Sequence, residues 1–213
     1  MTDKLLLKNH TLTEFCAVTA GSDPVPGGGS VSALVGAISA ALTEMVSNLT
    51  IGRKKYAEVE AEMIEVAEKA KEVRLFLTEA IDRDSEAYEM VSQAFKLPKE
   101  TEEEKSHRSE KIQEATKIAA TVPMEVARTT YELVPLIEKV IMKGNQNAIT
   151  DGCIAMMSCR LGVLGAILNV RINLGSIKDQ AFVKELTTFC EQLEKEITNV
   201  EHRLLQHTYK TLQ

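Results

Sequence analysis

Residues 57–95 carry the pattern that most constrains the fold of this chain. Apolar side chains recur there at spacings that alternate between three and four residues, as one face of an α-helix requires. The positions are Val59, Met63, Val66, Ala70, Val73, Leu77, Ala80, Tyr88, Val91 and Phe95. Such a helix buries its apolar stripe against neighbouring helices. The abundance of Ala, Leu, Glu and Lys favours helices, and only 4% of the residues are aromatic, which disfavours a β-sandwich. We therefore expect an all-α helical bundle in which residues 1–213 form a single domain of long antiparallel helices.

One position of this stripe is acidic. Asp84 fills the gap between Ala80 and Tyr88, where an ionised carboxylate is costly to bury without partners. Two interpretations follow: a satisfied structural acid that caps a neighbouring helix, or a catalytic carboxylate with a perturbed pKa. Asp82 and Glu86 lie off the stripe, so we expect them in solvent.

A run of three glycines precedes the second expected helix. Gly27, Gly28 and Gly29 lead into a helix over residues 30–50, a pattern that lets backbone approach a ligand and presents helix N-terminal amides to anions. The alternative is a flexible turn with Ser30 as an ordinary N-cap. The motif matches neither common nucleotide fingerprint, and no strand pattern precedes it. A nucleotide-binding fold is therefore not expected.

The helix over residues 30–50 is apolar on nearly every side, which predicts a buried central helix. Its small residues Ser32, Gly36 and Ala40 recur at helical spacing, which favours tight helix packing or a subunit interface. A basic segment follows at residues 53–55. It either complements the dipole of the preceding helix or forms a clamp for carboxylates of a ligand.

A later helix, capped by Asn145 or Asn147 and ending near Leu174, shows two distinct lines. One line is apolar: Ile154, Met157, Leu161, Leu164 and Leu168. The adjacent line is small or polar: Asp151, Ala155, Ser158, Gly162, Gly165, Asn169 and Asn173. The second line suits a cleft for a flat polar ligand, or equally close helix packing with polar ends.

The remaining helices are expected at residues 11–20, from about residue 101 to Thr121, onward to Lys143, and from Lys178 to the C-terminus. Pro123 is expected either to kink a helix or to open the next one.

Charge and cysteine usage exclude several classes of function. The net charge of −6 disfavours nucleic-acid binding. The four cysteines form no C-x-x-C motif, so we expect them to be buried thiols. We expect no zinc site, no other metal site and no disulfide framework. The longest uncharged apolar run, residues 31–43, is shorter than the ~20 residues of a bilayer span, and the first ten residues do not resemble a signal peptide. We expect a cytoplasmic protein that does not bind membranes.

Seven motifs together resemble the cyclodeaminase/cyclohydrolase family, which includes the cyclodeaminase half of formiminotransferase-cyclodeaminase. They are PGGGSV at 26–31, NLTIGRKKY at 48–56, DRDSEAY at 82–88, AFKLPK at 94–99, VPM at 122–124, GNQNAITD at 144–151 and GAILNVRINL at 165–174. They occur in the family's order and cover nearly the whole chain. Departures are mild: Arg53 replaces a usual lysine, Ala148 and Thr150 replace usual serines, and Gly152 replaces a usual alanine.

The resemblance implies an all-helical homodimer that acts on one-carbon units of tetrahydrofolate without a cofactor. The activity it favours is that of a lyase of histidine degradation, a formimidoyltetrahydrofolate cyclodeaminase that forms 5,10-methenyl-tetrahydrofolate and ammonia. The sequence contains no formiminotransferase domain, so a separate formiminotransferase would supply the substrate. The alternatives are a methenyltetrahydrofolate cyclohydrolase and a non-enzymatic helical oligomerisation module.

The resemblance and the residue patterns together nominate a site. Asp84 and Asp151 are the expected central carboxylates, with Asp82 as the less favoured substitute. The expected folate-binding residues are Gly27, Gly28, Gly29, Ser30, Asn48, Arg53, Lys54, Lys55, Tyr56, Tyr88, Asn145, Asn147, Asn169 and Asn173. The cations and the glycine segment would hold the glutamate carboxylates, a tyrosine would stack on a ring, and the asparagines would read the pterin edge.

Overall fold

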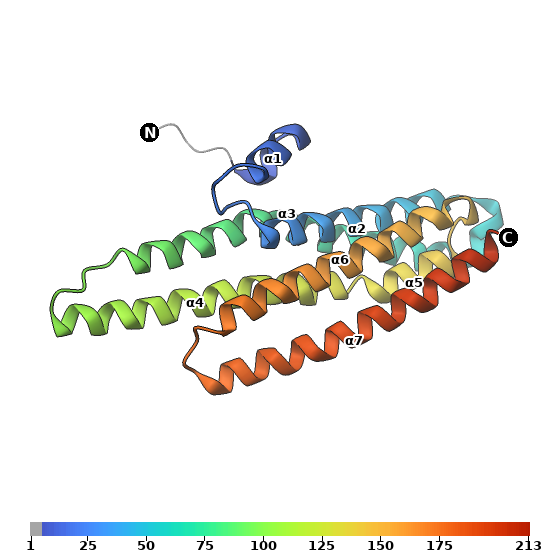
Figure 1. The fold of residues 1–213 in the computed structure, drawn as a ribbon. Coiled ribbons are helices and arrows are strands. Elements are labelled where there is room, and N and C mark those ends of the chain that lie inside the picture. Colours follow the sequence, from blue (N-terminus) through green and yellow to red (C-terminus); the bar gives the residue numbers. More distant parts are fainter. Residues whose placement is uncertain (1–5) are drawn as a thin grey trace.

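The computed structural model describes residues 6–213, which contain helices and no strand (Figure 1). The helices are α1 (Leu12–Thr19), α2 (Gly28–Thr50), α3 (Glu60–Phe95), α4 (Glu102–Tyr131), α5 (Val134–Lys143), α6 (Ile149–Leu174) and α7 (Gln180–Thr211). Short 3-10 turns lie at Leu7–Asn9, Lys54–Val59 and Gln146–Ala148. The predicted all-α bundle is confirmed.

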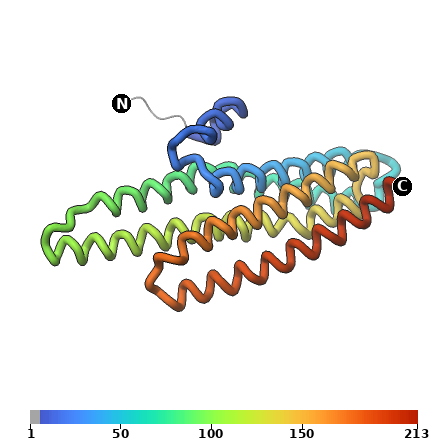
Figure 2. Tube along the Cα trace, in the orientation of Figure 1, coloured from blue at the N-terminus to red at the C-terminus, as the bar shows by residue number. Residues whose placement is uncertain are grey.

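Helices α2 and α6 form the centre of the bundle and run antiparallel. Helix α2 packs between α3 and α6, and α6 also packs on α4, α5 and α7. The core side chains include Met63, Leu77, Ile137, Ile141, Met156, Ile167 and Ile197. Figure 2 shows α1 standing apart from the bundle axis, and Phe15 is its buried side chain.

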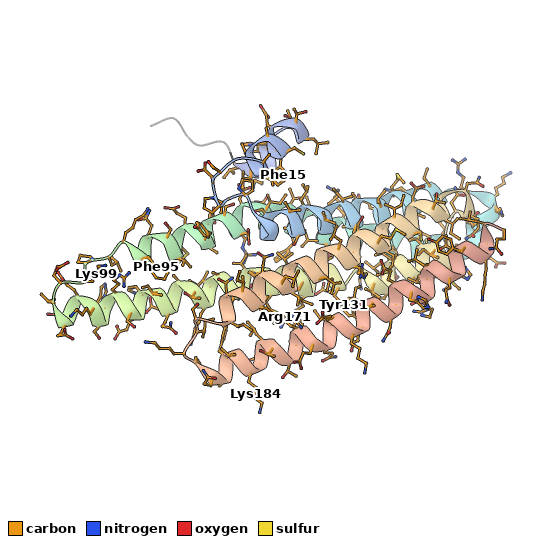
Figure 3. All side chains as sticks on the ribbon, in the orientation of Figure 1. Phe15, Phe95, Lys99, Tyr131, Arg171 and Lys184 are labelled. Carbon is orange, nitrogen blue, oxygen red and sulfur yellow. The ribbon has the colours of Figure 1, made fainter. Side chains whose placement is uncertain are left out.

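The predicted stripe of α3 is buried from Met63 to Ala80 and becomes exposed beyond Asp84. Tyr88 is 44% exposed and Phe95 is 54% exposed. The reason is visible in Figures 1 and 3, where α3 and α4 extend past the other helices as a two-helix arm that carries Phe95 near its tip. Only the inner part of the stripe has neighbours on several sides.

Two helix boundaries differ from the sequence prediction. Pro123 lies inside α4, which continues to Tyr131 with residues on both sides of the proline buried in the core. The break follows α4, because α5 has a proline in its first turn, where a missing amide costs no hydrogen bond. Ser30 is also not the N-cap of α2, since that position belongs to Gly27.

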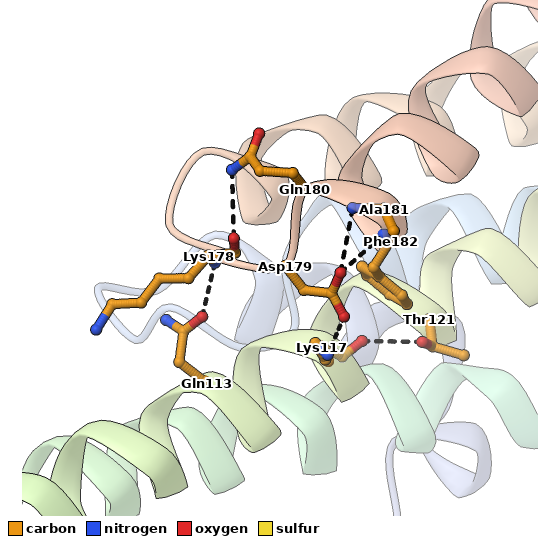
Figure 4. Close-up of polar contacts among 8 residues, drawn as sticks. All are labelled: Gln113, Lys117, Thr121, Lys178, Asp179, Gln180, Ala181 and Phe182. Atoms are coloured by element: carbon orange, nitrogen blue, oxygen red, sulfur yellow. Dashed lines mark hydrogen bonds and ion pairs between the residues drawn. The ribbon is translucent and has the colours of Figure 1, made fainter.

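The start of α7 is held against α4 by the polar contacts of Figure 4. The Lys178 backbone amide donates to Gln113 Oε1 at 2.7 Å, and Lys117 Nζ lies 2.7 Å from Asp179 Oδ2. Asp179 also caps α7 by accepting the amides of Ala181 and Phe182. The α6–α7 connection is therefore fixed on the bundle.

Small residues allow α2 and α6 to approach closely. A Cβ on Gly162 would lie 3.2 Å from the Gly36 backbone nitrogen, and Ser39 Oγ donates to the Ala155 carbonyl at 2.7 Å. The tight-packing interpretation of the small residues in α2 is confirmed. The small line of α6 likewise packs on α2, so the cleft interpretation is wrong for the middle of that line.

The predicted buried helix over residues 30–50 is central in the bundle, but its burial is incomplete, because its outward side carries exposed Ile38, Met45 and Leu49. Gly28–Thr50 and Gln146–Leu174 also have the length and mean hydropathy of membrane spans, 1.5 and 1.8. About half of an 18-residue apolar window in each segment, 56% and 50%, is buried inside the bundle. The fold of one chain therefore leaves part of the apolar surface of both helices uncovered.

Three cysteines are buried free thiols, as predicted: Cys153, Cys159 and Cys190. Cys16 on α1 is exposed instead, because that helix packs on the bundle through a single side.

Candidate functional site

Asp84 lies half-buried at the N-terminus of α2. Ser30 Oγ is 3.0 Å from Asp84 Oδ2, 3.0 Å from the Ile81 carbonyl oxygen and 3.3 Å from Ser85 Oγ. The hydroxyl of Ser30 therefore joins the carboxylate to the backbone of α3. The sequence analysis did not nominate Ser85, although it directly follows Asp84 in the DRDSEAY motif.

The glycine segment provides room for this carboxylate. A Cβ on Gly29 would lie 2.6 Å from Asp84 Oδ2 and closer still to Oδ1. A Cβ on Gly28 would lie 3.2 Å from Asn169 Nδ2. Gly28 and Gly29 are helical, so they act as the packing surface for two polar side chains and not as a flexible loop.

Burial raises the pKa of the Asp84 carboxyl, and hydrogen bonds from the Ser30 hydroxyl and amide oppose that rise. An acid that merely caps a helix is stabilised in its ionised form, which lowers its pKa. Asp84 occupies a capping position, yet its pKa moves in the opposite direction. A carboxyl of this kind can hold and release a proton, as a catalytic acid or base must.

Asn169 and Asn173 lie beside the same end of α2. Asn169 Nδ2 donates to the Gly165 carbonyl at 2.9 Å, and Asn173 Nδ2 donates to the carbonyls of Ala119 and Asn169. Their amide nitrogens are engaged with backbone, which leaves the side-chain oxygens as acceptors for a ligand.

Tyr88 lies one helical turn beyond Asp84 on α3. It lines a hollow of about 440 Å³ together with Val91, Ser92, Phe95 and Lys96. Its exposed ring is available for stacking beside the Asp84 carboxyl.

Asp82 has a structural role, which corrects the expectation that it lies in solvent. Its side chain is buried, and its two carboxylate oxygens accept the amides of Leu7 at 2.6 Å and Lys8 at 3.2 Å. These bonds fasten the segment before α1 to α3. With both oxygens engaged, Asp82 is a poor substitute for Asp84.

A second polar cluster lies at the opposite end of α2. The Asn145 amide donates to Thr50 Oγ1 at 2.9 Å, and Asn145 Nδ2 donates to the Leu49 carbonyl at 3.0 Å. The Tyr56 hydroxyl accepts the Gln146 amide at 3.0 Å. These bonds bring the NLTIGRKKY and GNQNAITD motifs together.

The nominated residues therefore divide into two groups. The Asp84 end comprises Gly27, Gly28, Gly29, Ser30, Asp84, Tyr88, Asn169 and Asn173. The Asp151 end comprises Asn48, Arg53, Lys54, Lys55, Tyr56, Asn145, Asn147 and Asp151. Each end brings together motifs that are far apart in the sequence.

The two ends are too far apart to act together within one chain. Helix α2 has 23 residues, which span about 34 Å at about 1.5 Å per residue. Asp151 and Asn169, at the two ends of α6, are separated by about 27 Å on the same rise. A catalytic acid and base must each lie within about 3 Å of the reacting atoms. Asp84 and Asp151 of the same chain do not meet this requirement.

The Asp151 end is open and basic. Arg53, Lys54 and Lys55 are exposed, and none of them forms an ion pair with another side chain of residues 6–213. Asn48 lines a shallow hollow of about 490 Å³ beside the Arg74–Glu44 ion pair. This end can bind carboxylates of a ligand.

Metal ligands do not converge at either end. Across residues 6–213, no group of three or more His, Cys, Asp or Glu side chains is placed to hold a metal ion. The residues at both ends offer proton transfer, hydrogen bonding and charge.

Comparison with known proteins places the chain in a family. The model of the formiminotransferase-cyclodeaminase family matches residues 11–192. The chain belongs to this family. A methenyltetrahydrofolate cyclohydrolase of Methylorubrum extorquens is 44% identical over 92% of this chain and 94% of its own length. The formimidoyltransferase-cyclodeaminase of Mus musculus is 34% identical over 85% of this chain, which spans about a third (33%) of that longer protein.

A solved structure has the same fold. The formiminotetrahydrofolate cyclodeaminase of Thermotoga maritima superposes with a TM-score of 0.86 at 35% sequence identity, covering 97% of this chain and 100% of the other. The family, like its fold, is thus shared with proteins named for two different folate reactions.

Proposed function

We propose that this chain is an enzyme that makes or breaks the one-carbon bridge between N5 and N10 of tetrahydrofolate. The observation that carries the proposal is the half-buried Asp84 carboxyl, whose pKa is raised at the N-terminus of α2 in a chain of the formiminotransferase-cyclodeaminase family. Both reactions named among its relatives require a group that exchanges a proton with nitrogen at that bridge.

The first candidate reaction is cyclodeamination of 5-formimidoyl-tetrahydrofolate. The N10 nitrogen attacks the amidine carbon and loses its proton, and the resulting aminal expels ammonia after its amino group is protonated. Asp84 can take the first proton and return a proton to the leaving amine. Because the attack is intramolecular, much of the acceleration comes from holding N10 close to the carbon. The solved relative from Thermotoga maritima and the mammalian relatives, named for this activity, support it.

The second candidate is hydrolysis of 5,10-methenyl-tetrahydrofolate to the 10-formyl compound. Water adds to the methenyl carbon, a carboxylate accepts its proton, and the bond from that carbon to N5 breaks as N5 is protonated. The 44% identical cyclohydrolase, which matches this chain along nearly its full length, favours this reaction. Carboxylates stabilise the cationic methenyl group in either direction.

The rest of the folate has matching partners in the proposal. Tyr88 stacks on an aromatic ring, and Asn169 and Asn173 read the pterin beside Asp84. Arg53, Lys54 and Lys55 lie at the opposite end of α2, so they can bind carboxylates of a ligand but do not reach the same folate within one chain. The reaction needs no cofactor. If it is cyclodeamination, a separate formiminotransferase supplies the formimidoyl substrate.

An optical assay with both substrates tests the proposal. The methenyl compound absorbs in the near ultraviolet, so cyclodeamination appears as a rising signal with stoichiometric ammonia, and hydrolysis appears as an accelerated fall. Either signal must be lost in the Asp84→Asn variant. No change with either substrate at high enzyme concentration refutes the proposal and favours a non-enzymatic oligomerisation module.

A further inference from the structure

The Asp84 end contains no cation for the negatively charged tail of a folate. Its residues are glycines, a serine, a tyrosine, asparagines and Asp84 itself, and the exposed cations at residues 53–55 lie about 34 Å away at the other end of α2. A folate that reacts at Asp84 therefore needs another partner for its glutamate carboxylates. The AFKLPK motif at residues 94–99 begins at the C-terminal end of α3, the helix that carries Asp84.

A groove runs along the outer part of α3. It is the hollow of about 440 Å³ that is lined by Tyr88, Val91, Ser92, Phe95 and Lys96, and we call it the α3 groove. Residues 84, 88, 91 and 95 recur at intervals of four, three and four, so they share one side of the helix. The carboxyl of Asp84 and the groove therefore lie on one line.

Packing on α4 forms the inner wall of the α3 groove. Val91 packs against a small cluster of Ala87, Ala119 and Val122. The carbonyl of Ala119 also accepts the side-chain amide of Asn173 at 3.0 Å. The groove is therefore connected to the asparagine side of the Asp84 end.

Arg108 of α4 fixes the outer end of the α3 groove. Its Nη2 and Nε donate to the Phe95 carbonyl at 3.0 Å and 3.3 Å, and its Cζ lies 5.5 Å from the centre of the Phe95 ring. These contacts hold the end of α3 on α4 near the tip of the arm, where Figure 3 labels Phe95. A wall that is already in place lowers the entropic cost of binding a ligand.

Lys96 supplies positive charge at this outer end. It is the C-cap of α3, its side chain is exposed, and its ammonium group forms no ion pair within the part of the chain that the structure describes. A lysine at a helix C-terminus complements the helix dipole without any ligand. Its place beside an aromatic groove that leads to Asp84 also suits a carboxylate of a ligand.

The length of the α3 groove matches the tail of a folate. Lys96 lies twelve residues beyond Asp84, about 18 Å along α3. Its extended side chain spans about 6 Å, so Nζ can lie about 12 Å from the level of Asp84. Eight bonds separate N10 of a folate from the carbon of its α-carboxylate, which is about 10 Å in an extended chain. Together with one hydrogen bond of about 3 Å to the lysine, the tail covers that distance.

We propose that the aminobenzoyl-glutamate tail of the folate lies along the α3 groove, with its ring against Tyr88 and its α-carboxylate paired with Lys96. This assignment rests on the proposed function, because it places N10 beside Asp84. Ser92 lies between the two contacts, and its hydroxyl can donate to the benzoyl carbonyl. The pterin then lies on the asparagine side of Asp84, away from the groove.

Two ligands that differ only in the glutamate test this assignment. The first is 5-formyl-tetrahydrofolate, and the second is its methylamide analogue, which keeps the ring and the amide but lacks both carboxylates. Isothermal titration calorimetry measures their binding without any need for turnover. Lys96→Met keeps the length of the side chain and removes its charge. It should weaken binding of the folate about 5-fold, the size of an exposed ion pair, and leave binding of the analogue unchanged.

Lys71→Met is the matched control. Lys71 is also exposed on α3 and lies thirteen residues before Asp84, so it carries the same charge at nearly the same distance in the opposite direction. This variant should bind both ligands like the wild type. Tyr88→Leu should weaken both ligands equally, about 10-fold, because contact with the ring does not depend on the glutamate. In steady-state kinetics Lys96→Met should raise KM and leave kcat unchanged, since the tail is bound equally in the ground state and the transition state.

Several results would overturn the assignment. Lys96→Met could weaken both ligands equally or neither of them, or Tyr88→Leu could leave both unchanged. A loss specific to the folate in Lys54→Met, with none in Lys96→Met, would place the tail at the other end of α2.

Failure of the groove is distinguishable from failure of the proposed function. An active enzyme whose KM does not respond to Lys96→Met refutes the groove and leaves the proposed function standing. Binding that depends on Lys96 and on the glutamate, without turnover of either substrate, refutes the proposed function and leaves the groove as a folate site. A wild type that binds neither ligand refutes both.

Discussion

Gly29→Ala should inactivate the enzyme while leaving its fold in place. The added methyl group would lie 2.6 Å from Asp84 Oδ2 and nearer to Oδ1, whereas ordinary contacts of a Cβ are at 3.4 Å or more. Relief of this clash moves the carboxyl by roughly 1 Å. A displacement of that size at a reacting group costs about 100-fold in rate, which corresponds to about 2.7 kcal/mol of transition-state stabilisation.

The effect on stability should be much smaller than the effect on rate. Overpacking typically costs about 1–3 kcal/mol, and replacing glycine by alanine in a helix returns about 1 kcal/mol. The net loss of at most about 2 kcal/mol lowers the Tm of a chain of this size by a few degrees. Circular dichroism melts and steady-state kinetics in the optical folate assay measure the two quantities separately.

Gly175→Ala is the matched control. Gly175 ends α6, and its added Cβ would meet no neighbour closer than the Ile172 carbonyl oxygen at 4.0 Å. Its kcat and Tm should stay near wild type. A folded Gly29→Ala enzyme with wild-type kcat would refute the argument that Asp84 must sit against the α2 N-terminus.

Four further substitutions test the site and the packing around it. Asp84→Asn should abolish turnover and raise the Tm at pH 7. Folding raises the pKa of this carboxyl above 3.8, so the unfolded chain loses the proton first as the pH rises, and the stability of the wild type falls between the two pKa values. The gain in Tm of the variant should therefore vanish below pH 3.8, where the carboxyl is protonated in both states. Ser30→Ala removes a hydrogen bond that lowers the pKa of Asp84, so the corresponding limb of the kcat/KM–pH profile should move to higher pH, and an unmoved limb would contradict the contact. Asp82→Ala should retain turnover but weaken hydrogen-exchange protection of the segment before α1 by about 1–3 kcal/mol; loss of turnover in a folded variant would reinstate Asp82 as catalytic. Gly162→Ala brings a Cβ within 3.2 Å of the Gly36 backbone. After the gain of about 1 kcal/mol from helix propensity, chemical denaturation should show a net loss of about 1 kcal/mol. An unchanged free energy of unfolding would mean that the helices can separate without cost.

Part of the candidate site could be predicted from sequence because its signals are local. An acid in the gap of an apolar stripe marked Asp84, and the glycine run marked the helix start against which it packs. The signal for Asp82 was misleading, because its burial depends on amides about 75 residues away that no periodicity reveals. Asp151 lies in the first turn of α6, as its place in the sequence indicated, but nothing local shows how far it lies from Asp84.

The sequence by itself determined the helices, since apolar periodicity and capping residues act within one or two turns. Thr11 and Thr101 form the capping boxes of α1 and α4, and both are readable from four consecutive residues. Tertiary structure decided everything that depends on neighbours. It decided that Pro123 stays within a helix, because core contacts on both sides of the proline hold α4 together.

Tertiary structure also decided which side of an all-round apolar helix is left uncovered. The composition of α2 and α6 does not distinguish a buried stripe from an exposed one, because both are apolar. The choice arises from the small residues, which pack closest and so turn the larger apolar side chains outward. The helix register then fixed the nominated residues at two levels of one bundle, a separation set by the length of α2 that no motif encodes.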